Sequence, residues 1–103
     1  MSEKIPEAYQ AFQEQYQAVW TAYDRLGAAV HQQGPLDEKT RELIKLGMAV
    51  GARLEGAVHS HTRKALAAGA TAEEIRQAIL LAIPTVGFPT MMAALTWAED
   101  ELR

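Results

Sequence analysis

Apolar residues recur at steps of three and four positions in every segment between the Gly and Pro residues of the chain. This spacing places them on one face of an α-helix, whereas a half-buried β-strand needs alternating apolar and polar residues. No segment sustains such alternation, and β-branched residues are scattered. The pattern therefore predicts an all-α protein.

The segment from Pro6 to Gln33 is expected to form one long helix, or two helices joined near Trp20–Ala22. Its apolar stripe lies opposite a Gln-rich side that we expect to be solvated. The stripe comprises Tyr9, Phe12, Tyr16, Val19, Trp20, Tyr23 and Leu26. Gly34 and Pro35 then end the segment, because glycine terminates helices and proline cannot continue one.

Two central helices are predicted on either side of Gly51, which marks a kink or a turn. Asp37 can cap the first of them through its side-chain oxygen. The second is expected from Arg53 to Ala68, where Gly69 supplies the stop. The apolar residues of the first helix are Leu43, Ile44, Leu46, Gly47 and Val50.

Two further helices are predicted in the C-terminal part. Thr71 and Glu74 have the spacing of a capping box, in which the two side chains satisfy free backbone amides at a helix start. Pro84 must kink or end this helix, and the last helix is expected from Pro89 to Leu102. The apolar positions are Ile75, Ala78, Ile79, Ala82 and Val86 in the first of the two, and Met92, Leu95 and Trp97 in the second.

Composition limits the organisation and the partners of the chain. With 103 residues, of which 49% are hydrophobic and 22% charged, it can build one core but not two. We therefore expect a single domain over residues 1–103. The net charge of −3 argues against nucleic acid as a partner, because phosphate binding requires clustered Lys and Arg.

Membrane insertion, export and thiol chemistry are not expected. The longest wholly apolar stretch, Ala78–Ile83, is far shorter than the roughly 20 residues of a membrane span. The N-terminus Met1–Lys4 lacks the apolar core of a signal peptide, so we expect a cytoplasmic protein. The chain contains no cysteine, which excludes disulfides, thiolate nucleophiles and cysteine-ligated metal clusters.

Two histidines, His59 and His61, lie in the second central helix. Residues two apart on a helix point about 200° away from each other, so the pair cannot share one metal ion. His59 falls on the charged side, where we expect a solvated i,i+4 pair with Glu55. His61 lies in an apolar arc. It is either a hydrogen-bonded core residue or a general acid or base that works near neutral pH.

Glu42 is the candidate partner of His61. Each lies nine or ten residues from the expected chain reversal near Gly51–Ala52, so an antiparallel hairpin would set them at the same height. A carboxylate beside a buried imidazole fixes its tautomer and raises its basicity. A separation of their side chains beyond about 8 Å would exclude such a pair, since no single water could bridge it.

Three blocks of sequence form an ordered set that resembles the carboxymuconolactone decarboxylase family, which includes the alkylhydroperoxidase D-like proteins. The blocks are LDEKTRELI at 36–44, HTRKALAAGATAEEI at 61–75 and VGFP at 86–89. The resemblance covers residues 34–98. It implies an all-α, compact bundle of about six helices that assembles through subunit contacts as a homotrimer or homohexamer.

In the peroxidase branch of this family, the site is a C-x-x-C-x-x-x-H motif with a glutamate twelve residues before the first cysteine. The resemblance places the histidine at His61 and the glutamate at Glu42, while the cysteine positions fall on Leu54 and Ala57. A peroxide-reducing cycle needs one sulfur to attack and another to resolve. Thiol peroxidase activity is therefore not expected.

The decarboxylase branch acts without these cysteines on an acidic lactone, and its histidine matches His61. The resemblance implies a lyase without cofactor or metal, in which His61 with Glu42 protonates the carbanion left by CO₂ loss. Arg41 or Arg63 would pair with the carboxylate of a small-molecule substrate. Each arginine also fits an exposed helix charge.

Two other functions stay open. The first is a non-catalytic assembly or binding protein, because about 100 residues bury only around two thirds of their unfolded surface and subunit contacts would complete the core. Met91 and Met92 in the last helix suit such contacts, or the core of a single chain. The second is a metal site built across subunits from His59 and Glu55.

Overall fold

The computed structural model describes residues 6–103. The segment Met1–Lys4, on which the expected cytoplasmic location rests, lies outside these residues. The described residues contain helices and no strands, so the all-α prediction is confirmed. None of the helices within residues 6–103 has the length and apolar character needed to cross a membrane.

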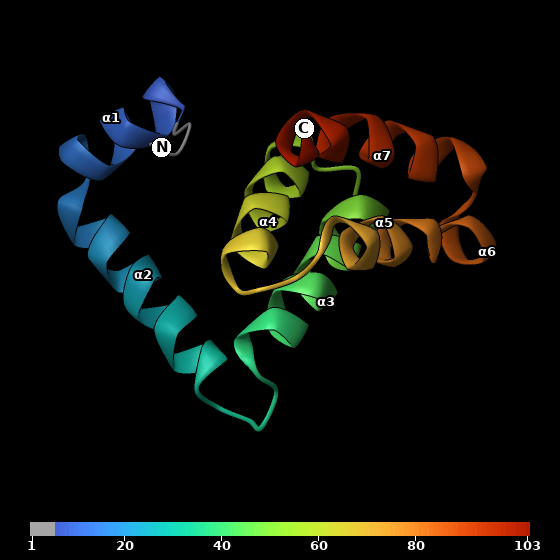
Figure 1. Cartoon of the computed structure of the whole chain (residues 1–103). Helices are drawn as coiled ribbons and strands as arrows, with labels where there is room; N and C mark the ends of the chain where they lie inside the picture. The colour runs from blue at the N-terminus through green and yellow to red at the C-terminus, as the bar shows by residue number, and fades with distance from the viewer. Residues whose placement is uncertain (1–5) are drawn as a thin grey trace. The chain divides into compact units, whose positions relative to one another are not determined.

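Contacts divide the chain into a unit that ends at Pro35 and a second unit, Leu36–Arg103. The first unit contains α1 (Glu7–Gln15) and α2 (Gln17–His31) (Figure 1). Tyr16 separates them with φ −127° and ψ 54°, so the break lies before the expected joint near Trp20–Ala22. A single domain over residues 1–103 stays a prediction.

Aromatic side chains provide the packing between α1 and α2. The rings of Tyr9 and Trp20 meet edge to face, with their centroids 5.4 Å apart. Tyr23 continues the row, with its centroid 6.0 Å from that of Trp20. No residue of either helix is buried, so the predicted apolar stripe does not form a closed core.

The second unit contains five helices: α3 (Glu38–Gly51), α4 (Glu55–Ala67), α5 (Ala72–Leu80), α6 (Ile83–Val86) and α7 (Phe88–Leu102). α3 packs against α4, α5 and α7, and α4 packs against α7 (Figure 1). α6 is a single turn that contains Pro84. The described residues thus form seven helices, in agreement with the expected number of about six.

Local chemistry sets the helix ends as expected. The side chain of Asp37 accepts a 2.8 Å hydrogen bond from the amide of Thr40 and so caps α3. Thr71 and Glu74 form a complete capping box at the start of α5. Gly69 follows α4 with φ +99°, a conformation in which a side chain would be strained.

The core of the second unit is formed by α3, α4, α5 and α7, with one further residue from the loop before α5. Its buried apolar residues are Leu46, Ala49, Val50, Val58, Ala65, Ala70, Ile75, Ile79, Met91, Ala94 and Ala98. Of the two methionines that suit either subunit contacts or the core of a single chain, Met91 is buried and Met92 is exposed. Ile44 and Val86, which belong to the apolar positions of the predicted helices, are also exposed.

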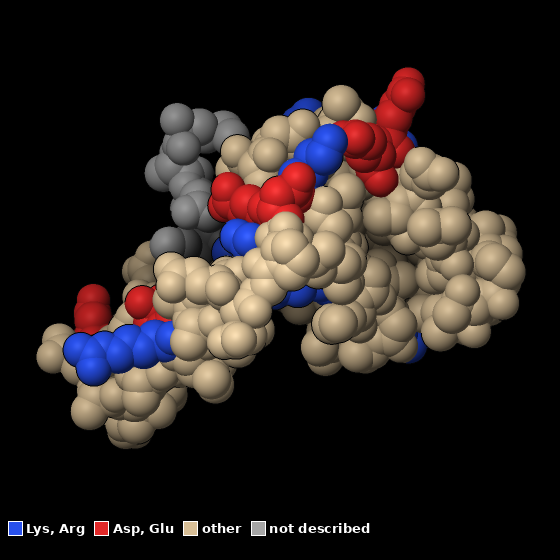
Figure 2. Space-filling model, turned by 90° about the horizontal axis from the view of Figure 1, so that it is seen from below, with Lys and Arg blue, Asp and Glu red and all other residues tan. Residues whose placement is uncertain are grey.

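Ion pairs reinforce the packing at the surface of this unit. Lys39 of α3 lies 3.0 Å from the carboxylate of Glu74 on α5. Arg76 of α5 makes a two-pronged contact of 2.7 and 3.0 Å with Glu99 of α7. On the face seen in Figure 2, acidic and basic side chains accordingly lie next to one another, and uncharged residues form most of the surface.

Candidate functional site

The hairpin of α3 and α4 carries the candidate site. The chain reverses in residues 52–54, where Arg53 adopts a left-handed conformation with φ 55°. Such a short connection makes consecutive helices antiparallel neighbours. α3 packs more extensively against α4 than against any other helix. Residues at similar distances from the turn are therefore brought together.

Glu42 of α3 and His61 of α4 meet in this hairpin. Oε1 of Glu42 lies 2.8 Å from Nδ1 of His61, so the predicted pairing is confirmed. Glu42 is 4% exposed, and the side chain of His61 is 16% exposed. A buried carboxylate requires a hydrogen-bond donor, which the Nδ1–H group of the imidazole supplies. The contact turns Nε2, the other ring nitrogen, away from Glu42.

Several groups act on the pKa of His61. Burial has the largest influence and lowers the pKa below its ordinary value of 6.5, since it disfavours the charged ring. The hydrogen bond and the negative charge of Glu42 oppose this effect, whereas the positive charges of Lys45 and Lys64 lower the pKa further. His61 is therefore mainly neutral at pH 7, and an anion bound nearby would favour its protonation.

The sequence analysis did not single out Lys45 and Lys64, whose positive charges lower the pKa of His61. Nζ of Lys45 lies 3.8 Å from Oε2 of Glu42, three residues earlier on α3. Lys64 has the same i,i+3 spacing from His61 on α4. Residues three apart are neighbours on a helix surface, so this spacing is the signal that could have identified both lysines.

Arg41 and Arg63, the predicted substrate-binding residues, have other partners. Nη1 of Arg41 donates a 2.6 Å hydrogen bond to the carbonyl of Leu36, and Nη1 of Arg63 lies 3.2 Å from Oε2 of Glu101. Both contacts are made with groups other than Glu42 and His61. A role of either arginine in substrate binding stays a prediction.

His59 is not the solvated residue that was expected. Its side chain is only 20% exposed, and Nδ1 lies 2.6 Å from Oε2 of Glu101 on α7. The expected i,i+4 pair with Glu55 is present, with Oε2 of Glu55 3.7 Å from Nε2. Burial raises the pKa of Glu101, but the hydrogen bond with His59 and the charge of Arg63 outweigh it and leave the pKa below its ordinary value. This cluster joins α4 to α7 on the side of α4 away from His61.

The sequence also suggested a metal site that subunits would share through His59. Across residues 6–103, no group of three or more His, Cys, Asp or Glu side chains is arranged to hold a metal ion. A site assembled from several subunits stays a hypothesis.

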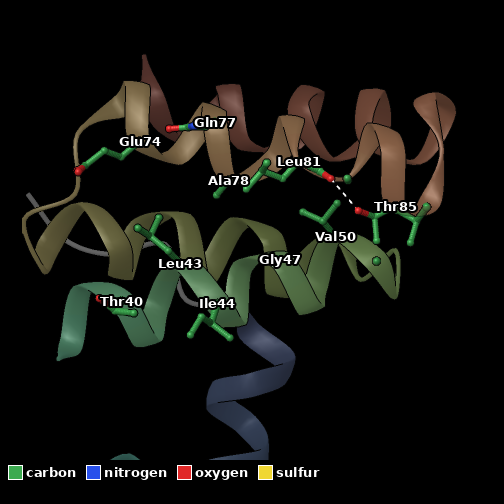
Figure 3. Close-up of a pocket in the computed structure, with 13 residues that line it drawn as sticks. Thr40, Leu43, Ile44, Gly47, Val50, Glu74, Gln77, Ala78, Leu81 and Thr85 are labelled. Atoms are coloured by element: carbon green, nitrogen blue, oxygen red, sulfur yellow. Dashed lines mark hydrogen bonds between the residues drawn. The ribbon is translucent and has the colours of Figure 1, made fainter. Parts of the chain in front are cut away.

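A groove of about 510 Å³ lies on a different face of α3 (Figure 3). It is bounded by α3 on one side and by α5 and α6 on the other. Its lining includes Leu43, Ile44, Gly47, Val50, Ala78, Leu81 and Thr85. Neither Glu42 nor His61 lines it. The exposed side chain of Ile44 thus borders the groove and does not enter the core.

Comparison with known proteins supports the family resemblance. The model of the carboxymuconolactone decarboxylase family matches residues 14–100. A crystal structure of a carboxymuconolactone decarboxylase family protein from Legionella pneumophila is similar to this fold, with a TM-score of 0.78 and 28% sequence identity. The similarity covers 90% of this chain and 85% of that chain.

Two curated relatives match shorter parts of the chain. An uncharacterised protein of Haemophilus influenzae is 45% identical over 51 residues, which are 50% of this chain and 45% of that protein. A nitrosuccinic acid decarboxylase of Metarhizium robertsii is 38% identical over 74 residues, which are 72% of this chain and 52% of that protein. The chain thus spans about half the length of the curated relatives it matches. From the family match and the shared fold, we conclude that the chain belongs to the carboxymuconolactone decarboxylase family.

Proposed function

We propose that this chain catalyses the loss of CO₂ from a small carboxylated lactone, carbonyl or nitro compound through acid–base chemistry at His61. The main support is the 2.8 Å hydrogen bond that joins His61 to the buried carboxylate of Glu42. Pairs of this kind position an imidazole for proton transfer. The similarity to a nitrosuccinic acid decarboxylase supports the same class of reaction.

The proposed reaction has two steps. The bond between the carboxylate and its neighbouring carbon breaks, CO₂ leaves, and the electron pair stays on that carbon. An adjacent carbonyl, lactone or nitro group takes up the charge as an enolate or nitronate. Protonated His61 then donates a proton from Nε2 to the carbon, and solvent returns a proton to the ring. The balance is R–CO₂⁻ + H⁺ → R–H + CO₂.

Glu42 acts through His61 in this scheme. Its carboxylate holds Nδ1 and thereby fixes the direction in which Nε2 points. Its negative charge also favours the imidazolium form, which is the form that can donate a proton. Glu42 is therefore a positioning residue, and His61 is the residue that meets the substrate.

Release of CO₂ tests the proposal. We expect the purified chain to accelerate decarboxylation of at least one of nitrosuccinate, a carboxylated γ-lactone and a β-keto acid, by about 10²-fold or more over buffer. Product formation is followed by NMR, and the heat-unfolded chain controls for spontaneous loss of CO₂. Absence of acceleration with all three compounds would contradict the proposed reaction.

A non-catalytic, ligand-binding role is the second candidate, and the groove between α3 and α5 favours it. Its volume of about 510 Å³ falls in the usual range of small-molecule sites, and it lies apart from His61. In this case, compounds would bind in the groove without loss of CO₂. Self-association, which the family resemblance implies, is compatible with either function. The same panel of compounds separates the two candidates.

A further inference from the structure

The helices α1 and α2 present an apolar face to solvent, and no residue of either helix is buried. Four side chains of this face form a row on α2, which we call the α2 stripe. They are between 58% and 65% exposed: Val19, Tyr23, Leu26 and Val30. Helices of 9 and 15 residues are marginally stable in water unless an apolar face packs against a partner. The α2 stripe therefore requires a covering surface.

The residues around the α2 stripe suit contact with a second helix. At 100° per residue, the four side chains of the stripe fall within an arc of about 60°. Ala22 and Gly27 border this arc, and a Cβ atom added to Gly27 would lie in open space. Asp24 and Arg25 lie about 130° from the centre of the arc. A helix can therefore approach the stripe closely without burying a charge.

The two ends of the α2 stripe have complementary shapes. A hollow of about 260 Å³ lies at its N-terminal end, lined by Tyr9, Phe12, Val19, Trp20 and Tyr23. At the C-terminal end, Leu26 and Val30 are exposed and lie outside this hollow. Two α2 helices that pair antiparallel about a centre between residues 24 and 25 would set residues at equal distances from that centre opposite each other. Leu26 of one copy then faces Tyr23 of the other, and Val30 faces Val19.

We propose that α2 pairs antiparallel with α2 of a second copy of this chain, and that Leu26 and Val30 of each copy fill the hollow of the other. Such a contact is isologous, because a two-fold axis makes each copy offer the same surface. It fills both hollows with side chains that are otherwise exposed. The seven large apolar side chains exposed in residues 6–35 provide roughly 800 Å² per copy, which is the area of a standard protein interface. This interface is independent of the proposed function, because it contains neither Glu42 nor His61.

Sedimentation velocity of the full chain tests the interface. We expect the wild type to associate at micromolar concentration. Leu26→Lys should sediment as a smaller species, with self-association weaker by about 30-fold or more, because a charge would enter an apolar contact. Circular dichroism verifies that the variant is folded.

Leu81→Lys is the matched control. Leu81 is 62% exposed, against 61% for Leu26, but it lines the groove beside α3. We therefore expect Leu81→Lys to associate as the wild type does. A monomeric wild type, or dissociation by Leu81→Lys and not by Leu26→Lys, would overturn the proposed interface.

Disulfide trapping tests the antiparallel register, and it also decides the case if Leu26→Lys fails to fold. The chain has no cysteine, so Tyr23→Cys and Leu26→Cys each introduce a single thiol. The two variants are mixed in equal amounts, oxidised with copper phenanthroline and separated by mass spectrometry. We expect disulfides mainly between unlike chains, because only opposed positions come within the roughly 7 Å that a disulfide spans between Cα atoms. Disulfides mainly between like chains, or none, would overturn the proposed pairing.

Discussion

The variant His61→Gln is expected to lower kcat for CO₂ release by about 10²–10⁴-fold, the usual contribution of a positioned general acid. Glutamine can keep a hydrogen bond to Glu42 through its amide but carries no titratable proton. The substitution therefore removes proton donation and preserves the local polar contact. Turnover is measured on the compound of the panel that the wild type decarboxylates fastest.

His59→Gln is the matched control for this experiment. His59 lies on the same helix two residues away, but its ring contacts Glu101 and faces away from His61. We expect its kcat to stay close to that of the wild type. Unchanged turnover in His61→Gln would refute the role of His61 as proton donor.

The variant Ile75→Ala is expected to lower the free energy of unfolding by about 2–5 kcal/mol. Ile75 of α5 is 0% exposed and lies within the core formed by α3, α4, α5 and α7. Truncation removes apolar contacts and leaves a cavity that the rigid surroundings fill only in part. Urea denaturation of the full chain, followed by circular dichroism, gives the change in free energy.

Leu81→Ala provides the comparison, because it deletes the same number of carbon atoms from a position that is 62% exposed. We expect it to change the free energy of unfolding by no more than about 0.5 kcal/mol. Equal losses in the two variants would show that Ile75 does not belong to the core.

The Glu42–His61 contact could be predicted from the sequence because a helix rises by a constant distance per residue. In a hairpin with a short loop, residues at equal distances from the turn become neighbours. The cap at Asp37 and the stop at Gly69 marked the outer ends of the two helices. The observed distance of 2.8 Å confirms the contact, while the catalytic role of the pair stays a prediction.

Contacts between helices far apart in the sequence could not be predicted. Glu101 lies 42 residues from His59, and the pattern around His59 showed only its i,i+4 neighbour Glu55. Periodicity shows which face of a helix a residue occupies, but it does not show which helix covers that face. For the same reason the apolar pattern of α3 did not show that Ile44 borders the groove.

Other deviations have local causes. The break between α1 and α2 falls at Tyr16, where neither glycine nor proline marks a helix end. Arg41 and Arg63 were predicted to bind substrate from their charge alone. That role stays a prediction, and Lys45 and Lys64 are the charged residues at i,i+3 spacing from Glu42 and His61.

The pH dependence of kcat/KM, measured with the NMR pKa of His61 in wild type and Glu42→Gln, tests the central claim most directly. We predict that kcat/KM falls as pH rises through the pKa of His61, below 6.5, because only the imidazolium can donate a proton. In Glu42→Gln, the NMR pKa and the fall in kcat/KM should both move to lower pH, because Glu42 raises the pKa. A profile that does not change with pH in this range, or that stays in place when the pKa of His61 moves, would contradict proton donation by His61.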